Sequence, residues 1–169
     1  MRRIIGILLA QTAVGCLIAA TTLSMGRAAQ VITIQDGNTI LVEDNSERIL
    51  IRLACIDAPE IGQDPYGSEA RHYLYTLIPP SSKVTLRLKA ITKDQRMVAE
   101  VFKDGENINM KMVEAGHAMV REKYIKKCDS KTFARLEQSA KNAKIGIWGS
   151  TETIEKPWKY RLSHPTTNR

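Results

Sequence analysis

The chain has 169 residues, of which 43% are hydrophobic and 25% charged; this is a globular composition and excludes a disordered or fibrous protein. The length allows one domain with extensions but not two domains of ordinary size. The formal net charge is +7, and three of the arginines lie in residues 1–28, which hold no acidic residue and leave an excess of +4 for the remainder. Such an excess suits an anionic partner such as nucleic acid without requiring one.

Residues 1–28 have the pattern of an export signal. Two arginines precede an uncharged, mainly apolar run from Ile4 to Met25, and small residues stand three and one positions before a possible cut after Ala28. We favour a cleaved signal because threonine and glycine dilute the apolar run. An uncleaved membrane anchor is the alternative, since about 20 apolar residues can span a bilayer. A lipoprotein signal at Cys16 is disfavoured because apolar residues follow that cysteine. Each interpretation exports the domain, to the periplasm, to the medium, or tethered at the inner membrane.

Export changes what is expected of the cysteines. Cleavage removes Cys16 and leaves Cys55 and Cys128, which an oxidising compartment allows to pair. A disulfide closing so long a loop restricts the unfolded chain and stabilises the fold by ~3–5 kcal/mol. Two buried free thiols are the alternative. The sequence has no CxxC motif and no Cys/His cluster, so no zinc site is expected.

The elements after the signal begin with strands. Residues 31–34 and 39–42 are rich in β-branched side chains and flank the turn Asp36-Gly37-Asn38, which predicts a hairpin. Residues 48–54 predict a third strand whose apolar side chains share one face, with Arg52 on the other face near its end. The segment Asp57-Ala58-Pro59-Glu60 interrupts that strand.

Helices and further strands follow in alternation. A helix is expected from Ser68, as its cap, to about residue 77, where two prolines stop it. Residues 83–89 and 97–102 predict strands, and residues 108–114 and 131–144 predict helices, the last with Gly146 as its C-cap. From residue 150 the chain is polar, punctuated by proline and without periodicity.

This order of elements predicts an OB-type, five-stranded β-barrel with about three helices. Periodicity alone leaves an α+β sandwich open. The predicted organisation is a signal peptide or anchor at 1–28, the barrel domain at 29–149 and a polar C-terminal tail at 150–169.

Polar side chains that suit phosphodiester hydrolysis occur at the ends of the predicted strands. The reaction needs an activated water, cations beside the phosphate oxygens and, in many enzymes, a metal ion. Arginine supplies forked donors, glutamate can orient or deprotonate water, and carboxylate and carbonyl oxygens suit Ca²⁺. Turns are rich in Asp and Asn for other reasons, so spacing alone does not establish a site. The residues concerned are Asn38, Arg52, Asp57, Glu60 and Arg96.

Five blocks of the sequence resemble the staphylococcal (micrococcal) nuclease family. They run in family order from Val31 to Trp148, and the block Ile51-Arg52-Leu53-x-x-Ile56-Asp57-Ala58-Pro59-Glu60 is highly specific. The others are Val31-x-x-Ile34-x-Asp36-Gly37-Asn38-Thr39, Tyr66-Gly67-x-Glu69-Ala70, Arg96-x-Val98-Ala99 and Leu136-Glu137-x-x-Ala140 with Gly146-Ile147-Trp148. The resemblance implies an OB-fold nuclease that depends on Ca²⁺, cleaves DNA and RNA with little sequence preference and leaves 3′-phosphate ends. We expect a monomer with no obligate protein partner.

The resemblance also implies a role for each matching residue. Arg52 and Arg96 hold the phosphate and stabilise the transition state, and Glu60 activates or positions water. Ca²⁺ is held by the Asp57 carboxylate, the Ala58 backbone carbonyl and Asn38. Two further residues are candidates for binding substrate: Tyr124, where the family has a pocket tyrosine, and Lys93.

Four departures from the family pattern bear on activity. Asn38 replaces an aspartate ligand and brings no charge, which predicts weaker Ca²⁺ binding. Thr92 and Gln95 alter the loop before Arg96, Glu122 replaces a second pocket tyrosine, and the loop at residues 61–65 is short. These departures support an alternative function, a domain that binds nucleic acid but cleaves it weakly or not at all. The joint presence of Arg52, Glu60 and Arg96 favours the enzyme.

Overall fold

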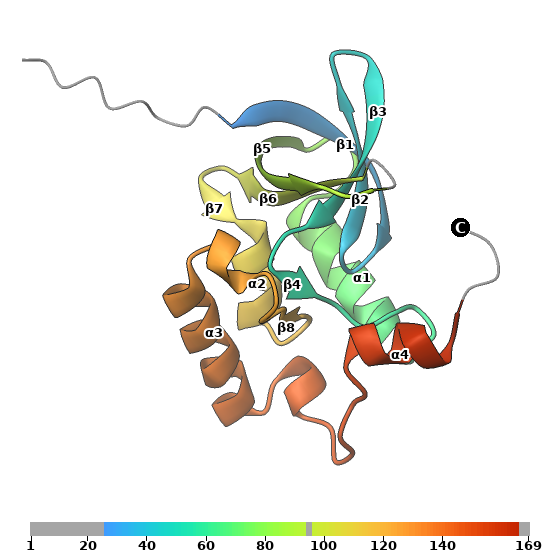
Figure 1. The fold of residues 1–169 in the computed structure, drawn as a ribbon, viewed down its shortest axis with the longest axis vertical. Coiled ribbons are helices and arrows are strands. Elements are labelled where there is room, and N and C mark those ends of the chain that lie inside the picture. Colours follow the sequence, from blue (N-terminus) through green and yellow to red (C-terminus); the bar gives the residue numbers. More distant parts are fainter. Residues whose placement is uncertain (1–25, 94–95, 166–169) are drawn as a thin grey trace, which may run out of the picture.

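The computed structural model of the chain describes residues 26–93 and 96–165 (Figure 1). The predicted apolar segment from Ile4 to Met25 lies outside these residues. Within the described ranges, no helix has the length and apolar character needed to cross a membrane.

Five long strands build a closed barrel. They are β1 (Arg27–Asp36), β2 (Thr39–Asp44), β3 (Glu47–Leu53), β5 (Lys83–Ile91) and β6 (Met97–Lys103). Neighbours pair antiparallel in the order β3-β2-β1-β5-β6, with the two-residue β7 (Glu106–Asn107) at the edge. A parallel pairing between β3 and β6 closes the sheet on itself, so the predicted five-stranded OB-type barrel is confirmed.

The barrel interior is filled by the apolar side chains that alternate along these strands. Their partners on the opposite face of each strand point outward, which is the period-2 pattern of a sheet with one buried face. The largest of the interior side chains are fully or almost fully buried: Val31, Ile40, Val42, Ile51, Leu53 and Val101.

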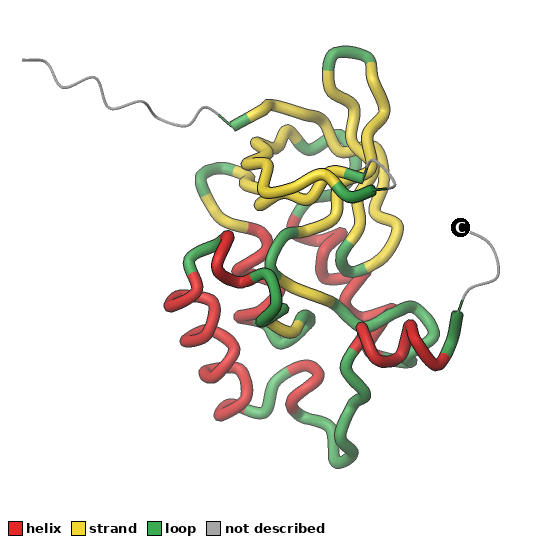
Figure 2. The backbone as a smooth tube through the Cα atoms, viewed as in Figure 1, coloured by secondary structure: helices red, strands yellow, loops and turns green. Residues whose placement is uncertain are grey.

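Of the four α-helices in residues 26–93 and 96–165, three cover one end of the barrel (Figure 2). They are α1 (Tyr66–Leu77), α2 (Ile108–Glu114) and α3 (Ser130–Ala143), with the short 3-10 helices η1 (Ile125–Lys127) and η2 (Gly146–Trp148) on either side of α3. Asn109 of α2 is completely buried and ties this layer to the barrel. Its amide donates to the carbonyls of Ala54 (2.9 Å) and Ala99 (3.2 Å) and accepts from the amide of Val101 (2.9 Å).

Two predicted helix ends differ in the structure. Helix α1 begins at Tyr66, and the hydroxyl of Ser68 donates to the Pro65 carbonyl (2.7 Å) instead of capping the helix. Helix α3 ends at Ala143, and its C-cap Lys144 has the left-handed conformation (φ 52°), so Lys144 takes the place expected for Gly146. The expected caps lie three positions from the N-cap Pro65 and two positions from the C-cap Lys144.

The C-terminal residues that sequence patterns place in a tail form a fourth helix. Helix α4 (Pro157–Ser163) starts with a buried proline at its first position, where proline suits a helix. Figure 1 shows that the chain turns back after η2 and brings α4 beside the beginning of α1. Seven residues are too few to display a helical period, which explains why no pattern is visible in the sequence.

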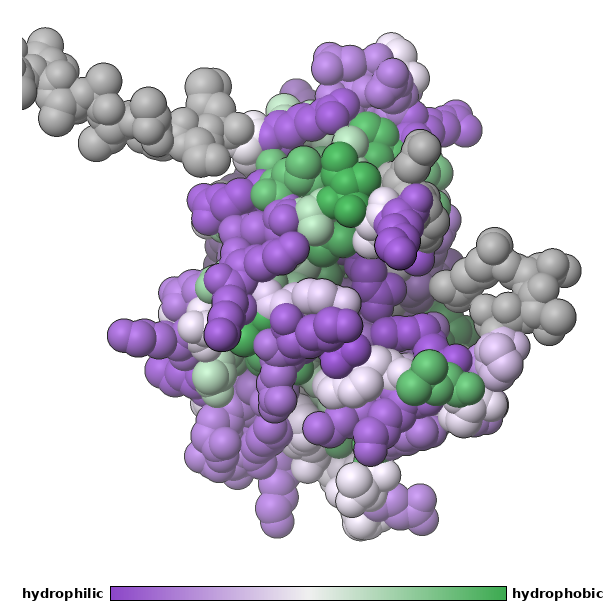
Figure 3. All heavy atoms as spheres, viewed as in Figure 1, coloured by the Kyte–Doolittle hydropathy of each residue, from purple (hydrophilic) through white to green (hydrophobic). Residues whose placement is uncertain are grey.

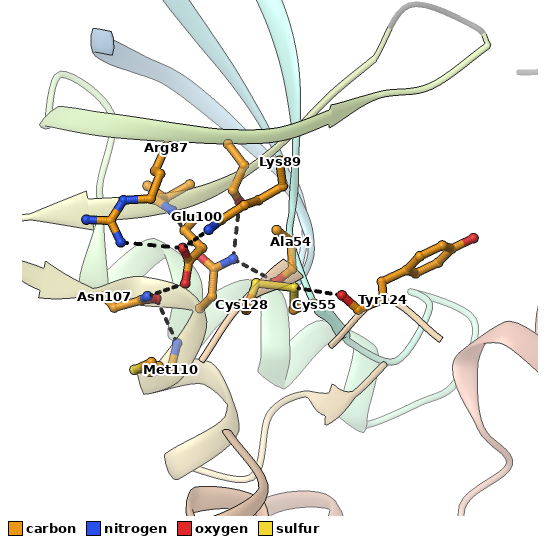
Figure 4. Close-up of a disulfide and its surroundings, with 12 residues drawn as sticks. Ala54, Cys55, Arg87, Lys89, Glu100, Asn107, Met110, Tyr124 and Cys128 are labelled. Carbon is orange, nitrogen blue, oxygen red and sulfur yellow. Dashed lines mark hydrogen bonds and ion pairs between the residues drawn. A yellow bond between two sulfur atoms is a disulfide. The ribbon is translucent and has the colours of Figure 1, made fainter. Parts of the chain in front are cut away.

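Cys55 and Cys128 are joined by a disulfide, with their Cα atoms 6.4 Å apart (Figure 4). Cys55 lies between β3 and the short strand β4 (Ile56–Asp57), and Cys128 ends η1. The disulfide therefore links the end of η1, just before α3, to Cys55, which lies two residues before Asp57.

Candidate active site

A two-strand ladder outside the barrel positions Asp57. Strand β4 pairs antiparallel with β8 (Met119–Val120), and the amide of Arg121 donates to the Cys55 carbonyl at 2.8 Å, which extends the ladder. Two-residue strands carry no detectable period, so the sequence does not predict them. Their effect is to hold Asp57 and Arg121 side by side at the end of the barrel.

The β1–β2 turn brings Asn38 to the same place. The Asp36 carboxylate accepts from the backbone N–H of Asn38 (2.7 Å), and the backbone carbonyl of Asn38 accepts from the backbone N–H of Leu53 (2.9 Å). A Cβ atom at Gly37 would lie only 2.6 Å from that of Ala70 on α1, so this close approach requires glycine.

Asp57 is the centre of the site. Its side chain is only 2% exposed, and its Oδ1 accepts from Nη2 of Arg52 at 2.6 Å. The side-chain amide of Asn38 contacts both Asp57 and Arg52, and its two orientations make different hydrogen bonds. In one, Nδ2 donates to Asp57 Oδ1 at 3.3 Å; in the other, Oδ1 accepts from Arg52 Nη2 at 3.0 Å. The second orientation satisfies more of the neighbouring donors. Asn38, Arg52 and Asp57 are thus in mutual contact, and their predicted roles in binding Ca²⁺ and phosphate stay predictions.

A residue that sequence reasoning missed completes the cluster: Arg161 of α4. Its Nη2 donates to Asp57 Oδ2 at 2.5 Å, its Nη1 donates to Oδ1 at 3.1 Å, and Nη1 also donates to Oε1 of Glu60. Burial by itself lowers the pKa of Arg161, but hydrogen bonds and charge attraction from Asp57 and Glu60 outweigh it and raise that pKa above its ordinary value. The guanidinium therefore stays charged. Arg161 is 104 positions from Asp57, and only the basic character of the tail hints at it.

The loop that contains Glu60 fixes its backbone through two hydrogen bonds to Gln63. Its amide donates to Oε1 of Gln63 (2.9 Å), and its carbonyl accepts from the Gln63 amide (2.8 Å). A Cβ atom at Gly67 would lie 2.0 Å from the Glu60 carbonyl oxygen, so the start of α1 packs directly on this loop. The Glu60 side chain is 19% exposed, so water can reach it.

Arg96 faces the same cavity as Arg52 and Asp57. The loop before it is closed by Thr92, whose hydroxyl accepts from the Arg96 amide (3.0 Å) and donates to the Arg96 carbonyl (3.0 Å). Threonine at position 92 therefore holds this loop by hydrogen bonds to the backbone. Gln95 lies outside the described residues.

Several arginines line a cavity of about 570 Å³. Its charged lining residues include Arg52, Asp57, Arg96, Arg121, Lys127 and Arg161, and its apolar ones include Ile91 and Val98. Figure 3 shows an apolar patch over the barrel strands, and on β5 the side chains of Leu88 and Ile91 are 51% and 60% exposed. A ligand with a flat apolar part and an anionic part, such as a nucleotide unit, fits this mixed lining. Glu60 lines an adjoining cavity of about 460 Å³, and Arg161 lines both.

The two candidate substrate-binding residues are placed differently. Tyr124 lines the larger cavity with its ring 45% exposed, and in Figure 4 that ring extends away from the disulfide. Lys93 and Glu122 are exposed, and neither is among the residues that line this cavity. The roles of Tyr124 and Lys93 remain predictions.

The oxygen donors at Asp57 suit a hard cation such as Ca²⁺ in type. The predicted ligands are the Asp57 carboxylate, the Asn38 amide oxygen and the Ala58 carbonyl, and of these the Asn38 and Asp57 side chains are in contact. In the part of the chain that the structure describes, no three His, Cys, Asp or Glu side chains gather as a metal site. Both oxygens of Asp57 already accept from guanidinium groups, so a cation there has to replace at least one of those contacts.

Comparison with known proteins agrees with this geometry. Residues 50–150 match the family described as "Staphylococcal nuclease homologue". A protein named "Micrococcal nuclease" from Shigella flexneri is 34% identical over 141 residues, which cover 78% of this chain and 79% of that protein. An "Uncharacterized endonuclease" from Escherichia coli O157:H7 is 34% identical over 133 residues, covering 78% and 83%. "Protein ParB" from Escherichia coli is 30% identical over 169 residues, covering 95% and 93%. The chain belongs to the staphylococcal nuclease family and is a nuclease of that family.

Proposed function

We propose that this nuclease depends on Ca²⁺, hydrolyses DNA and RNA with little sequence preference and leaves 3′-phosphate ends. The observation that carries the proposal is the meeting of Arg52, Asp57 and Glu60 through shared hydrogen bonds beside the cavity that Arg96 lines. Arg52, Asp57 and Glu60 lie within nine residues of sequence, but Arg96 follows 36 positions after Glu60, and a barrel that served only as a scaffold has no need to bring it to them.

Each side chain has a distinct task in the proposed reaction. Arg52 and Arg96 place forked N–H donors on the phosphate oxygens and stabilise the charge that grows there in the transition state. Glu60 takes a proton from the attacking water or holds that water in line. The water oxygen bonds to phosphorus as the bond to the 5′ oxygen breaks, and that oxygen takes a proton from solvent to become a hydroxyl, so the phosphate stays on the 3′ side. Asp57, Asn38 and the Ala58 carbonyl would hold Ca²⁺, which would add positive charge beside the phosphate.

Lack of sequence preference follows from the kind of contacts available. The described cavity offers charged donors for phosphate and apolar side chains, such as Ile91 and Val98, for a base. Contacts with the phosphate backbone position a nucleic acid but carry no sequence information. An unpaired strand presents a base face to these apolar side chains more easily than a duplex does, so single-stranded substrates should be cleaved faster.

The test is cleavage of labelled single-stranded DNA and RNA by the purified chain, with Ca²⁺ and with a chelator of divalent cations. We expect cleavage of both substrates only with Ca²⁺, at many positions, and fragments whose 3′ ends become extendable by a polymerase after phosphatase treatment. Cleavage undiminished by the chelator would contradict the metal dependence. Fragments that are extendable without phosphatase would contradict the proposed end chemistry.

A binding-only domain is the second candidate. Two observations favour it: Asn38 brings no charge to the metal ligands, and Glu60 is engaged by Arg161. In the same assay, this candidate predicts retention of labelled DNA by the protein without any cleavage, with and without Ca²⁺.

We also propose that the domain is exported through its N-terminal segment, and the Cys55–Cys128 disulfide supports this because such bonds persist in oxidising compartments. Arg27 and Ala28 belong to β1 and pair with β5, so a cut after Ala28 would shorten this strand. N-terminal sequencing of the protein from the periplasm or medium tests the proposal: a start at Ala29 supports cleavage, and a start at residue 1 in the membrane fraction supports an anchor.

A further inference from the structure

The C-terminal segment from residue 150 to residue 163, here called the C-terminal arm, is docked on the site by several separate contacts. The Tyr160 hydroxyl donates to the Gly62 carbonyl at 3.1 Å, and Nε2 of the Gln63 side chain donates to the Glu155 carbonyl at 2.8 Å. The guanidinium of Arg121 lies 4.2 Å from the ring centre of Trp158, a cation–π contact. These contacts are made by residues 155–160, which directly precede Arg161, so they place its side chain over Asp57 and Glu60.

Arg161 occupies the position that a divalent cation needs. It is bonded to both carboxylate oxygens of Asp57 and to Glu60, and it lines both cavities. A buried carboxylate requires a positive partner, and a guanidinium fork or a metal ion can supply it. The two cannot share the same carboxylate oxygens.

Charge near the site makes this competition strong. Arg52 and Arg121 also face Asp57, at 2.6 Å and 3.9 Å, so an ion that arrives while Arg161 stays in place meets three guanidinium groups. Asn38 adds no negative charge to offset them. Release of Arg161 both exposes the Asp57 oxygens and frees the Glu60 carboxylate for water.

We propose that the C-terminal arm is an autoinhibitory latch, in which Arg161 serves as a resident counter-ion that Ca²⁺ must displace from Asp57 and Glu60. This proposal rests on the proposed Ca²⁺ dependence, and it adds that the C-terminal arm regulates the binding of Ca²⁺. The latch keeps the buried carboxylates neutralised when Ca²⁺ is scarce and sets the Ca²⁺ concentration at which the site becomes competent. A latch closed nine-tenths of the time weakens the apparent affinity for Ca²⁺ about tenfold.

The first test measures Ca²⁺ binding without nucleic acid, by calorimetry on the full chain. The dissociation constant for Ca²⁺ should be lower in Arg161→Gln than in the wild type by a factor of about ten or more. Arg135→Gln is the matched control, because Arg135 is an exposed arginine on α3 and its loss changes the net charge equally. Tyr160→Phe keeps the guanidinium but removes the hydroxyl that anchors α4, so it should tighten binding by a smaller factor. Circular dichroism verifies that each variant is folded.

A second readout follows the arm itself. Hydrogen–deuterium exchange of residues 157–163 should become faster in the wild type when Ca²⁺ is added, whereas a ligand that only stabilises the fold would slow it. Unchanged or slower exchange would overturn the latch.

The remaining outcomes separate this inference from the proposed function. If the wild type cleaves DNA only with Ca²⁺ and Arg161→Gln binds Ca²⁺ no more tightly, the latch is wrong and the function stands. Equal affinity combined with slower cleavage would make Arg161 a substrate ligand instead. If no variant binds Ca²⁺, both the latch and the metal dependence fail.

Discussion

The disulfide between Cys55 and Cys128 should contribute a large part of the stability of the domain. We consider the double variant Cys55→Ala/Cys128→Ala and, separately, the reduced wild type. The two cysteines are 73 positions apart, and the chain-entropy relation puts the closure of such a loop at about 4 kcal/mol at 25 °C. For a domain of this size the same loss lowers Tm by ~10–15 °C.

Denaturant unfolding of the oxidised protein, the reduced protein and the double variant measures this contribution. Reduction keeps both cysteine side chains in place, so agreement between the reduced protein and the variant would assign the loss to the cross-link and not to packing. The slope of the unfolding free energy with denaturant should also rise in both, because the unfolded chain without the bond is more expanded. A loss below about 1 kcal/mol in both cases would refute the reasoning.

Three further substitutions test particular contacts. Gly67→Ala places a Cβ atom 2.0 Å from the Glu60 carbonyl and should cost roughly 1–3 kcal/mol of unfolding free energy and also slow cleavage; wild-type values for both would contradict the close packing. Arg52→Lys keeps the charge but loses the planar fork and should slow cleavage of DNA by about 10²–10³-fold at saturating substrate, so a wild-type kcat would count against the assigned role. Burial lowers the pKa of His117 below its ordinary 6.5, so the unfolded chain takes up this proton first and stability should fall as the pH drops below about that value. Unfolding of His117→Asn between pH 7.5 and 5.5 should lack that part of the decrease; an identical decrease would contradict the assignment.

The barrel could be predicted because its signals are local. Strand β5 alternates exposed and buried side chains from Lys83 to Arg87, and the turn Asp36-Gly37-Asn38 joins two runs rich in β-branched residues. Each of these patterns is complete within a few residues of sequence. The path of the chain within those strands then brings Asn38 and Arg52 together, since Thr39 and Arg52 are paired in the β2–β3 register.

The rest of the site could not be predicted from the same kind of signal. Strand β4 has two residues and α4 has seven, and neither length displays a period. The contact of Arg161 with Asp57 spans 104 positions and depends on how a nonperiodic segment folds back over the helices. A basic tail indicates an affinity for carboxylates but not which carboxylates it will meet. For this reason the sequence predicted the site without the residue that covers it.

The rate at which Glu60→Gln cleaves single-stranded DNA with Ca²⁺, relative to the wild type, tests the proposed function most directly. The control is Glu47→Gln, which removes an exposed carboxylate at the start of β3, away from the site. If Glu60 activates or positions the attacking water, Glu60→Gln should cleave about 10²–10⁴-fold more slowly while Glu47→Gln matches the wild type. Equal rates for Glu60→Gln and the wild type, or a wild type that binds DNA without cleaving it, would contradict the proposed reaction.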